Sequence, residues 1–382
     1  MGIKSFSFGK LDIKRVGMII GIGALVVLFG FFGTIINFLV DLSWFKEVGY
    51  TDTFIKMVFS KLTVGIPIFI LFYILLTIYL KILNKKYYET VDIVPDKDGE
   101  KISNRIRSIA VVIISILSAF SISSIFWMDI LKFMNSTVFG ITDPIFNKDI
   151  SFYVFKLPLI NNLFALTLNA LLVLVMVTVV YLVILMGQNP LANDEYTGTD
   201  DNVRDMYPGL RTQASRNKLI DLGLSIIIKI GVVFFIILSM KNVLATYDLL
   251  YSSRGAIFGA GYTDVNVTLW VYRIKAVVAV VIAVVLLFGR KSANKKKLAL
   301  GGVSVLVIVT LLGAGAELAV QNFLVSPDEL SKERPYIQNV IKYTNLAYGL
   351  DAVQIKDYAV DQNLTVNDIL NNKETITNIS IN

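Results

Sequence analysis

The chain changes character within one continuous stretch. LALGGVSVLVIVTLLGAGAELAV (298–320) is apolar almost throughout, and QNFLVSPDELSKERPYIQNVIKYTNLAY (321–348), which follows it directly, is polar and carries two prolines. An apolar run of more than about 18 residues can cross the roughly 30 Å hydrocarbon core of a bilayer. The sequence therefore predicts that the polypeptide leaves the membrane for water close to Gln321.

The whole chain has the composition of a membrane protein. Of its 382 residues, 55% are hydrophobic and 17% are charged, and the mean hydropathy is +0.67, whereas soluble domains carry about 25% charged residues. Long apolar stretches recur, without the short alternating segments of a membrane β-barrel. We predict an all-α protein with a short N-terminus (1–15), a seven-helix bundle (16–320) and a tail (321–382). The predicted spans are 16–40, 57–80, 108–128, 163–186, 219–240, 268–288 and 298–320.

The residue types that are missing exclude several kinds of site. The chain contains no cysteine and no histidine, so it has no disulfides, no thiolate nucleophile, no Cys/His zinc site and no His- or Cys-ligated haem. Histidine is also the residue that most often acts as general base in enzymes, so that common catalytic group is missing. We expect no cofactor, no metal and no nucleic-acid partner, because the net charge of +7 is better explained by membrane topology.

The basic residues between the spans alternate in number. The N-terminus and the connections 81–107, 187–218 and 289–297 hold 20 Lys and Arg, whereas 41–56, 129–162 and 241–267 hold 7. Because basic connections stay on the cytoplasmic side, we predict a multi-pass protein of the cell membrane. Its N-terminus would be cytoplasmic and its tail extracytoplasmic.

The tail is predicted to begin an extracytoplasmic α+β domain. Ser326 fits a helix N-cap with Glu329 as the capping-box acid. A second helix is expected from Pro335, ending at Gly349. The stretches 353–358 and 375–381 alternate weakly, as strands do. About 60 residues make only a marginal core, so we expect the domain to be larger and the chain to be incomplete.

Ionisable groups within apolar spans are costly and often functional. Lys229 lies mid-span, where its amine barely reaches an interface, so we expect it to face the bundle interior, in a transport role or in a structural hydrogen bond. Arg273, Lys275 and Glu317 lie at similar depths. We predict that Glu317 pairs with Arg273 or Lys275, near Asn169 in depth. The alternative is that the two cations snorkel to the outer headgroups.

The three outer connections are rich in aromatic residues and glycine, which indicates structured segments at the membrane interface or beneath an outer domain. The glycine-rich stretch 254–264 is not a phosphate loop, because it lacks the Gly-Lys-Ser/Thr ending. We predict that these connections and the start of the tail form a platform joining the bundle to the outer domain. Its candidate residues are Trp44, Tyr50, Asp143, Arg254, Gly259, Gly261, Tyr262, Asp264 and Tyr336.

Four of these stretches resemble one family. DLSWFKEVGY (41–50), DPIFNKDISFYVF (143–155), YSSRGAIFGAGYTD (251–264) and ERPYI through AYGLD (333–351) are similar to uncharacterised protein family 0182, whose members are bacterial multi-pass membrane proteins. The resemblance runs from about residue 15 to the end. It implies seven spans followed by a large extracytoplasmic domain, with the N-terminal part only present here. It supplies no catalytic residue.

Three functions stay open from the sequence. The first is an envelope protein whose bundle anchors an outer domain that binds or organises something at the cell surface. The second is a transporter or channel component using the polar groups within the spans. The third is an envelope enzyme acting on a lipid-linked substrate with outer carboxylates such as Asp129, Asp143 or Asp264. The expected partners are the lipid bilayer and an envelope protein or lipid-linked molecule. The oligomeric state is not predicted.

Overall fold

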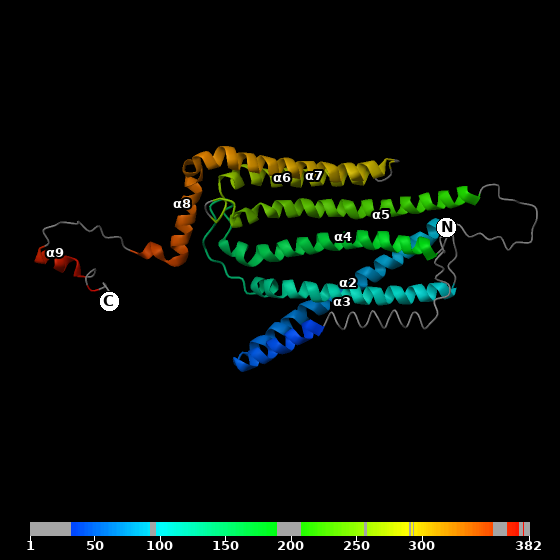
Figure 1. The fold of residues 1–382 in the computed structure, drawn as a ribbon, viewed down its shortest axis with the longest axis horizontal. Helices are drawn as coiled ribbons and strands as arrows, with labels where there is room; N and C mark the ends of the chain where they lie inside the picture. The colour runs from blue at the N-terminus through cyan, green and yellow to red at the C-terminus, as the bar shows by residue number, and fades with distance from the viewer. Residues whose placement is uncertain are drawn as a thin grey trace, which may run out of the picture.

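The computed structural model describes residues 32–91, 97–188, 208–255, 258–289, 292, 294–353, 365–373 and 377. Nearly all of these residues are helical (Figure 1), and they include no strand, only an isolated bridge between Thr142 and Asp149. A helix over 32–47 comes first. It is followed by the helices α2 (Thr51–Val91), α3 (Lys97–Met134), α4 (Leu157–Gln188), α5 (Pro208–Ala245), α6 (Leu269–Gly289), α7 (Lys295–Val320), α8 (Glu329–Tyr348) and α9 (Val366–Asn371).

Six helical segments of the described chain are long and apolar enough to cross a membrane. Their most apolar windows are only 6–33% buried inside the structure, so most of their apolar surface faces outward, as in a protein covered by lipid. Five of the last six predicted spans fall within one of these segments, and the other, 163–186, extends three residues beyond the segment Phe152–Val183 but stays within α4. Of the first predicted span, residues 16–31 lie outside the described residues, so a seventh span is not tested.

The long helices pack as a layered bundle. In Figure 1, α4 to α7 run side by side, whereas α2 crosses α3 obliquely. One apolar cluster joins α2, α3, α4 and α5 around Tyr87 and Leu219, and a second joins α5, α6 and α7 around Ala279. At Gly313 of α7, an added Cβ would lie 2.5 Å from Val271 of α6. Glycine is therefore what allows α7 to lie this close to α6.

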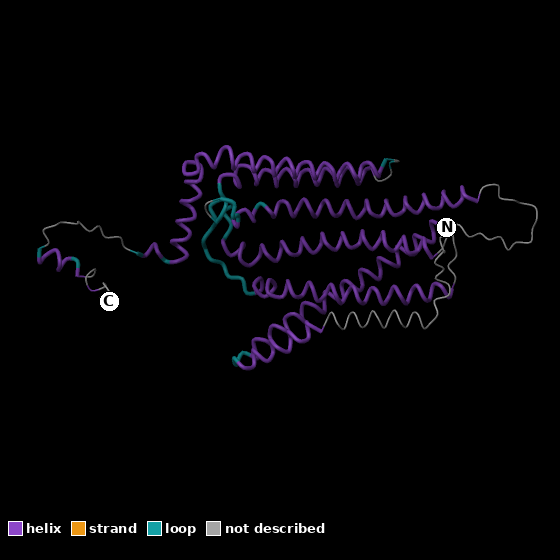
Figure 2. The backbone as a smooth tube through the Cα atoms, viewed as in Figure 1, coloured by secondary structure: helices purple, strands orange, loops and turns teal. Residues whose placement is uncertain are grey.

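Short π-helical and 3-10 turns connect the long helices at one end of the bundle. The alternating stretch 150–155 is helical, because the π-helical turn η2 (Phe152–Lys156) runs directly into α4. Similar turns are η4 (Asp264–Thr268) before α6 and η5 (Gln321–Val325) after α7, and the 3-10 turn η3 (Tyr247–Tyr251) follows α5. Figure 2 shows two described connections at this end, which we call the loop end: residues 135–151 and residues 246–255 with 258–263, with α8 beside them.

The start of the tail differs from the prediction of two helices. Ser326 begins a 3-10 turn (η6, Ser326–Asp328) and does not cap a helix; its hydroxyl donates to the carbonyl of Gln321 at 2.9 Å. Pro335 lies inside the single helix α8 rather than at its start. Tertiary contacts of α8, described below, offset the amide hydrogen that the proline lacks. Gly349 ends the helix with φ +66°, as predicted. Residues 354–364, 374–376 and 378–382 lie outside the described residues, so the predicted strands are not tested.

Candidate functional site

Helix α8 is fastened to the loop end by a buried carboxylate. The Glu333 side chain is only 2% exposed, and both of its oxygens accept a hydrogen bond from the Tyr262 amide at 3.1 Å. A Cβ at Gly261 would lie 3.0 Å from both carboxylate oxygens, so the glycine leaves the space that Glu333 fills. Burial raises the pKa of the Glu333 carboxyl above its ordinary value, since a charged group loses hydration there.

Further contacts run along α8 and the turn that precedes it. The Thr263 hydroxyl donates to Gln321 Oε1 at 2.6 Å, and the Asn266 amide reaches the Tyr336 hydroxyl at 3.3 Å. The Tyr343 hydroxyl donates to the carbonyl of Thr142 at 2.7 Å. Both described connections of the loop end therefore hold α8.

Gly259 adds an apolar contact to this junction. Its φ of +144° is one that few L side chains adopt, and an added Cβ would lie 3.6 Å from Val340 of α8. The Gly259 amide donates to the carbonyl of Ser252 at 2.7 Å, which closes the loop on itself. The glycine positions singled out in the sequence thus serve turn geometry and close packing.

Arg254 joins the loop to α7 and to the turn η4 that precedes α6. Its guanidinium pairs with Glu317 Oε2 at 2.7 Å and with Asp264 Oδ1 at 3.6 Å, and it donates to the Thr268 hydroxyl at 2.9 Å. The predicted pairing of Glu317 with Arg273 or Lys275 is therefore wrong, because a loop residue reaches the carboxylate instead.

The two predicted partners of Glu317 lie against rings of their own helix. The Arg273 guanidinium carbon lies 4.9 Å from the Trp270 ring centre, and the Lys275 amine lies 5.1 Å from the Tyr272 ring centre. Such cation–π contacts stabilise a cation without an ion pair. This arrangement agrees with the alternative in which both side chains extend toward an interface.

Asp143 organises the connection between α3 and α4. Its buried carboxylate accepts hydrogen bonds from the amides of Ile145 (2.9 Å), Phe146 (2.6 Å) and Lys148 (2.7 Å) and from the Tyr153 hydroxyl (2.8 Å). A carboxylate with four donors on it is a structural centre. It ties the loop to the π-helical turn that opens α4.

Other predicted residues lie away from α8. Trp44 and Tyr50 are exposed (57% and 61%) near the turn between the helix 32–47 and α2, and in Figure 1 the start of α2 lies apart from α8. Lys229 is exposed on α5, so the prediction that it faces the bundle interior is wrong. It shares that face with Val233 and Ile236, both exposed. Asn169 is exposed on α4.

The sequence pattern does not reveal the residue that fastens α8. Glu333 stands in the motif ERPYI, of which only Tyr336 is among the predicted platform residues. An acid placed between Lys332 and Arg334 gives the impression of a solvated surface group, and nothing in the local pattern shows that Tyr262 offers it a buried amide. Within the described residues, no group of three or more Asp and Glu is placed to hold a metal ion.

Comparisons with known proteins identify relatives over nearly the whole chain. The model of an uncharacterised protein family (UPF0182) matches residues 18–382, so the match is not restricted to an N-terminal part of this chain. A UPF0182 protein of Alkaliphilus metalliredigens is 35% identical over 92% of the chain, and one of Clostridium acetobutylicum is 33% identical over 97%. The chain covers 37% and 40% of the lengths of these relatives. No solved structure matches.

Proposed function

This chain belongs to the uncharacterised protein family UPF0182, and we propose that it anchors and supports a large extracytoplasmic domain in the cell membrane. The observation that carries the proposal is the docking of α8 through buried Glu333. A linker between independent parts would be solvated and free to reorient. Here the segment that leaves the last apolar helix is held at Glu333, Gln321, Tyr336 and Tyr343.

The proposed topology has seven spans, with the N-terminus in the cytoplasm and the loop end outside. The distribution of 20 against 7 basic residues supports this orientation. The residues around the Glu333 junction and the Arg254 cluster would then form the platform on which the outer domain rests. The partners of that domain would be an envelope protein or a lipid-linked molecule, beside the bilayer itself.

The longer length of the relatives also supports an anchor. The chain spans about two fifths of the lengths of the curated relatives it matches. In those proteins, more than half of the polypeptide lies outside the stretch that corresponds to this bundle and tail. A rigid α8 would set the direction in which such a further part extends.

The alternatives lack a comparable observation. The transport hypothesis drew on Lys229, Arg273 and Glu317 within the spans, but the Lys229 side chain is exposed and Glu317 pairs with Arg254. The enzyme hypothesis depended on available outer carboxylates, yet Asp129 accepts from Asn162 at 2.6 Å and Asp264 pairs with Arg254. Asp143 is saturated by its four donors.

The topology is tested by cysteine labelling of intact cells, which is simple because the chain has no native cysteine. Single cysteines at the exposed positions Ser253, Ser292 and Ser331 would be treated with a membrane-impermeant maleimide. We expect labelling at 253 and 331 and none at 292; the reverse pattern would overturn the orientation. A fourth cysteine at Lys229 should stay unlabelled, whereas labelling would reveal an aqueous path and favour transport.

The docking of α8 is tested with Val340→Cys as a reporter, because Val340 packs on Gly259. Adding Glu333→Ala should raise the labelling rate of this cysteine several-fold, since the Tyr262 amide loses its acceptor. The matched control is Glu329→Ala, which removes an exposed carboxylate one turn earlier on the same helix. Equal rates in the two backgrounds would mean that Glu333 does not hold α8, and the anchor proposal would lose its main support.

A further inference from the structure

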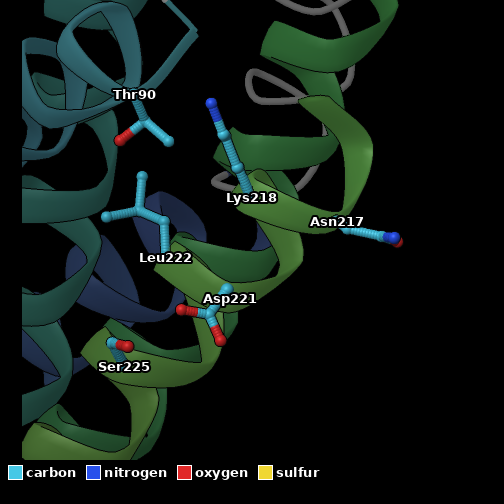
Figure 3. Close-up of a pocket in the computed structure, with 6 residues that line it drawn as sticks. All are labelled: Thr90, Asn217, Lys218, Asp221, Leu222 and Ser225. Atoms are coloured by element: carbon cyan, nitrogen blue, oxygen red, sulfur yellow. The ribbon is translucent and has the colours of Figure 1, made fainter. Parts of the chain in front are cut away.

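An open pocket of about 570 Å³ lies at the end of the bundle opposite the loop end (Figure 3). It is formed where the end of α2 meets residues 217–225 of α5. Its lining combines one apolar side chain with polar and charged ones: Thr90, Asn217, Lys218, Asp221, Leu222 and Ser225.

The charges around this pocket do not cancel. Asp221 is neutralised by an ion pair with Lys295 of α7, and the same amine donates to the Ser225 hydroxyl at 3.2 Å. In Figure 3, Lys218 extends from α5 on the side of Thr90. Lys218 has no ion-pair partner among the described residues. Counted over the described residues, the pocket therefore has one uncompensated positive charge, with a second lysine amine, that of Lys295, close to its edge.

The pocket lies at the level of the lipid headgroups. Lys218 and Asp221 stand at the start of the apolar segment Asn217–Ala245, and Lys295 is the first residue of α7. Charged residues at the ends of apolar helices mark the boundary between hydrocarbon and headgroups. Leu222 lies one turn further along α5 than Lys218, so the pocket has an apolar wall beneath its cation.

From these features we infer that the pocket binds the phosphate group of an anionic phospholipid. Lys218 supplies the compact charge that suits a phosphate, and the Ser225 hydroxyl retains its hydrogen for donation because it accepts from Lys295. Leu222 contacts the first carbons of the lipid. Basic pockets between spanning helices recognise anionic headgroups in this way. The inference holds for either orientation in the membrane and does not depend on the anchor function.

The test measures lipid retention by the full chain. The protein would be purified in detergent with added phosphatidylglycerol or phosphatidylcholine, and bound lipid would be counted by native mass spectrometry across a titration. We expect phosphatidylglycerol to be preferred, and Lys218→Gln to weaken its binding about fivefold. Lys297→Gln is the matched control, because Lys297 is exposed at the same end of α7 and does not line the pocket.

A second variant, Asp221→Asn, tests whether positive charge in the pocket strengthens lipid binding. Asp221→Asn removes the carboxylate and frees Lys295, so binding of phosphatidylglycerol should become several-fold tighter. The inference is overturned if Lys218→Gln and Lys297→Gln weaken binding equally, or if wild type shows no preference between the two lipids. Weaker binding by Asp221→Asn would also overturn it. Competition by millimolar inorganic phosphate would overturn the assignment to a lipid and leave a soluble phosphate as the ligand.

Discussion

Charged side chains have partners within the chain at the loop end of the bundle, whereas on the flank of α5 a charged side chain is exposed without an ion-pair partner among the described residues. At the loop end, three charged groups have partners within the chain: Asp143 is bound by amides of its own connection and by Tyr153, Arg254 by Glu317, and Glu333 by Tyr262. On the flank of α5, Lys229 stands exposed beside Val233 and Ile236, and none of the described residues forms an ion pair with it. Charge that is matched within the chain fixes a structure. Charge left on an apolar flank costs free energy unless lipid or a partner compensates it.

This difference separates two roles for polar residues in one membrane protein. The loop-end groups connect segments that are distant in sequence: Arg254 pairs with Glu317, and Tyr343 bonds to Thr142. They join both connections of the loop end to α7 and α8. The flank groups join no segments, and changing them should leave the fold intact.

The largest effect is expected at Asp143. Asp143→Ala removes the acceptor of three backbone amides and the Tyr153 hydroxyl. Because each buried donor left without a partner costs about 1–3 kcal/mol, we expect a loss of roughly 3 kcal/mol or more, measured by thermal unfolding in detergent. Asp351→Ala removes an exposed carboxylate and serves as control. An Asp143 variant as stable as this control would show that the cluster does not stabilise the loop end.

On the flank of α5, removing a charge should be favourable instead of destabilising. Lys229→Leu replaces a cation near the middle of an apolar segment, so membrane insertion of the segment 217–245 should become more favourable by about 3 kcal/mol. A translocon-based insertion assay measures this. Lys241→Leu, near the end of the same helix, should change insertion much less. If Lys229→Leu instead unfolded the protein, Lys229 would have a structural partner and the contrast between the two regions would fail.

A smaller effect is expected at Gly261. In Gly261→Ala the new Cβ would meet Glu333 Oε1 and Oε2 at 3.0 Å. The Glu333 side chain must shift, which should cost about 1 kcal/mol, at the low end of the range for overpacking. Gly255→Ala is the matched control, because nothing lies within 4 Å of its added Cβ. Equal melting temperatures would indicate that the junction has more room than the backbone implies.

The sequence predicted the apolar helices but not the contacts that join them. The six spans from 57–80 to 298–320 lie within described helices because length and apolar content are local properties of a segment. The helices extend beyond the spans, as α2 does, since polar residues at the ends still form helix. Gly349 was predicted correctly for the same reason, because a left-handed C-cap depends on its own backbone.

The failures concern long-range partners. The predicted partners of Glu317 were residues within the spans at a similar depth. Arg254, which pairs with Glu317, lies in a loop and was therefore not considered. The inward orientation of Lys229 assumed that helices surround α5, yet that face of α5 is an outer one. Pro335 was predicted to start a helix because it lacks an amide hydrogen, a property that can be read from the local sequence. The contact between Glu333 and Tyr262 that stabilises α8 around Pro335 is long-range and cannot be read there.

Acid should weaken one part of the loop end and spare another. The Asp149 carboxylate accepts from Ser151, Phe139 and Gly140, and hydrogen bonds, chiefly from Ser151, lower its pKa from 3.8 to about 2. A carboxyl whose pKa is lower in the folded state contributes stability that is present above about pH 4 and is lost as the pH falls toward 2. The pKa of Glu333 is raised, mainly by burial, so its protonation favours the folded state and the docking of α8.

Hydrogen exchange, corrected for its intrinsic pH dependence, distinguishes the effect of acid on the Asp149 loop from its effect on α8. Between about pH 4 and pH 2, protection of residues 139–151 should fall in wild type. Protection of α8 should hold, because below its ordinary pKa of 4.5 the Glu333 carboxyl is already protonated in both the folded and the unfolded state. Asp149→Asn should remove most of the pH dependence in the loop and leave α8 unchanged. Parallel loss of protection in both segments would mean that the loop end unfolds as one unit in acid. Loss of protection in residues 139–151 alone would show that Asp149 and Glu333 stabilise the same end of the molecule independently.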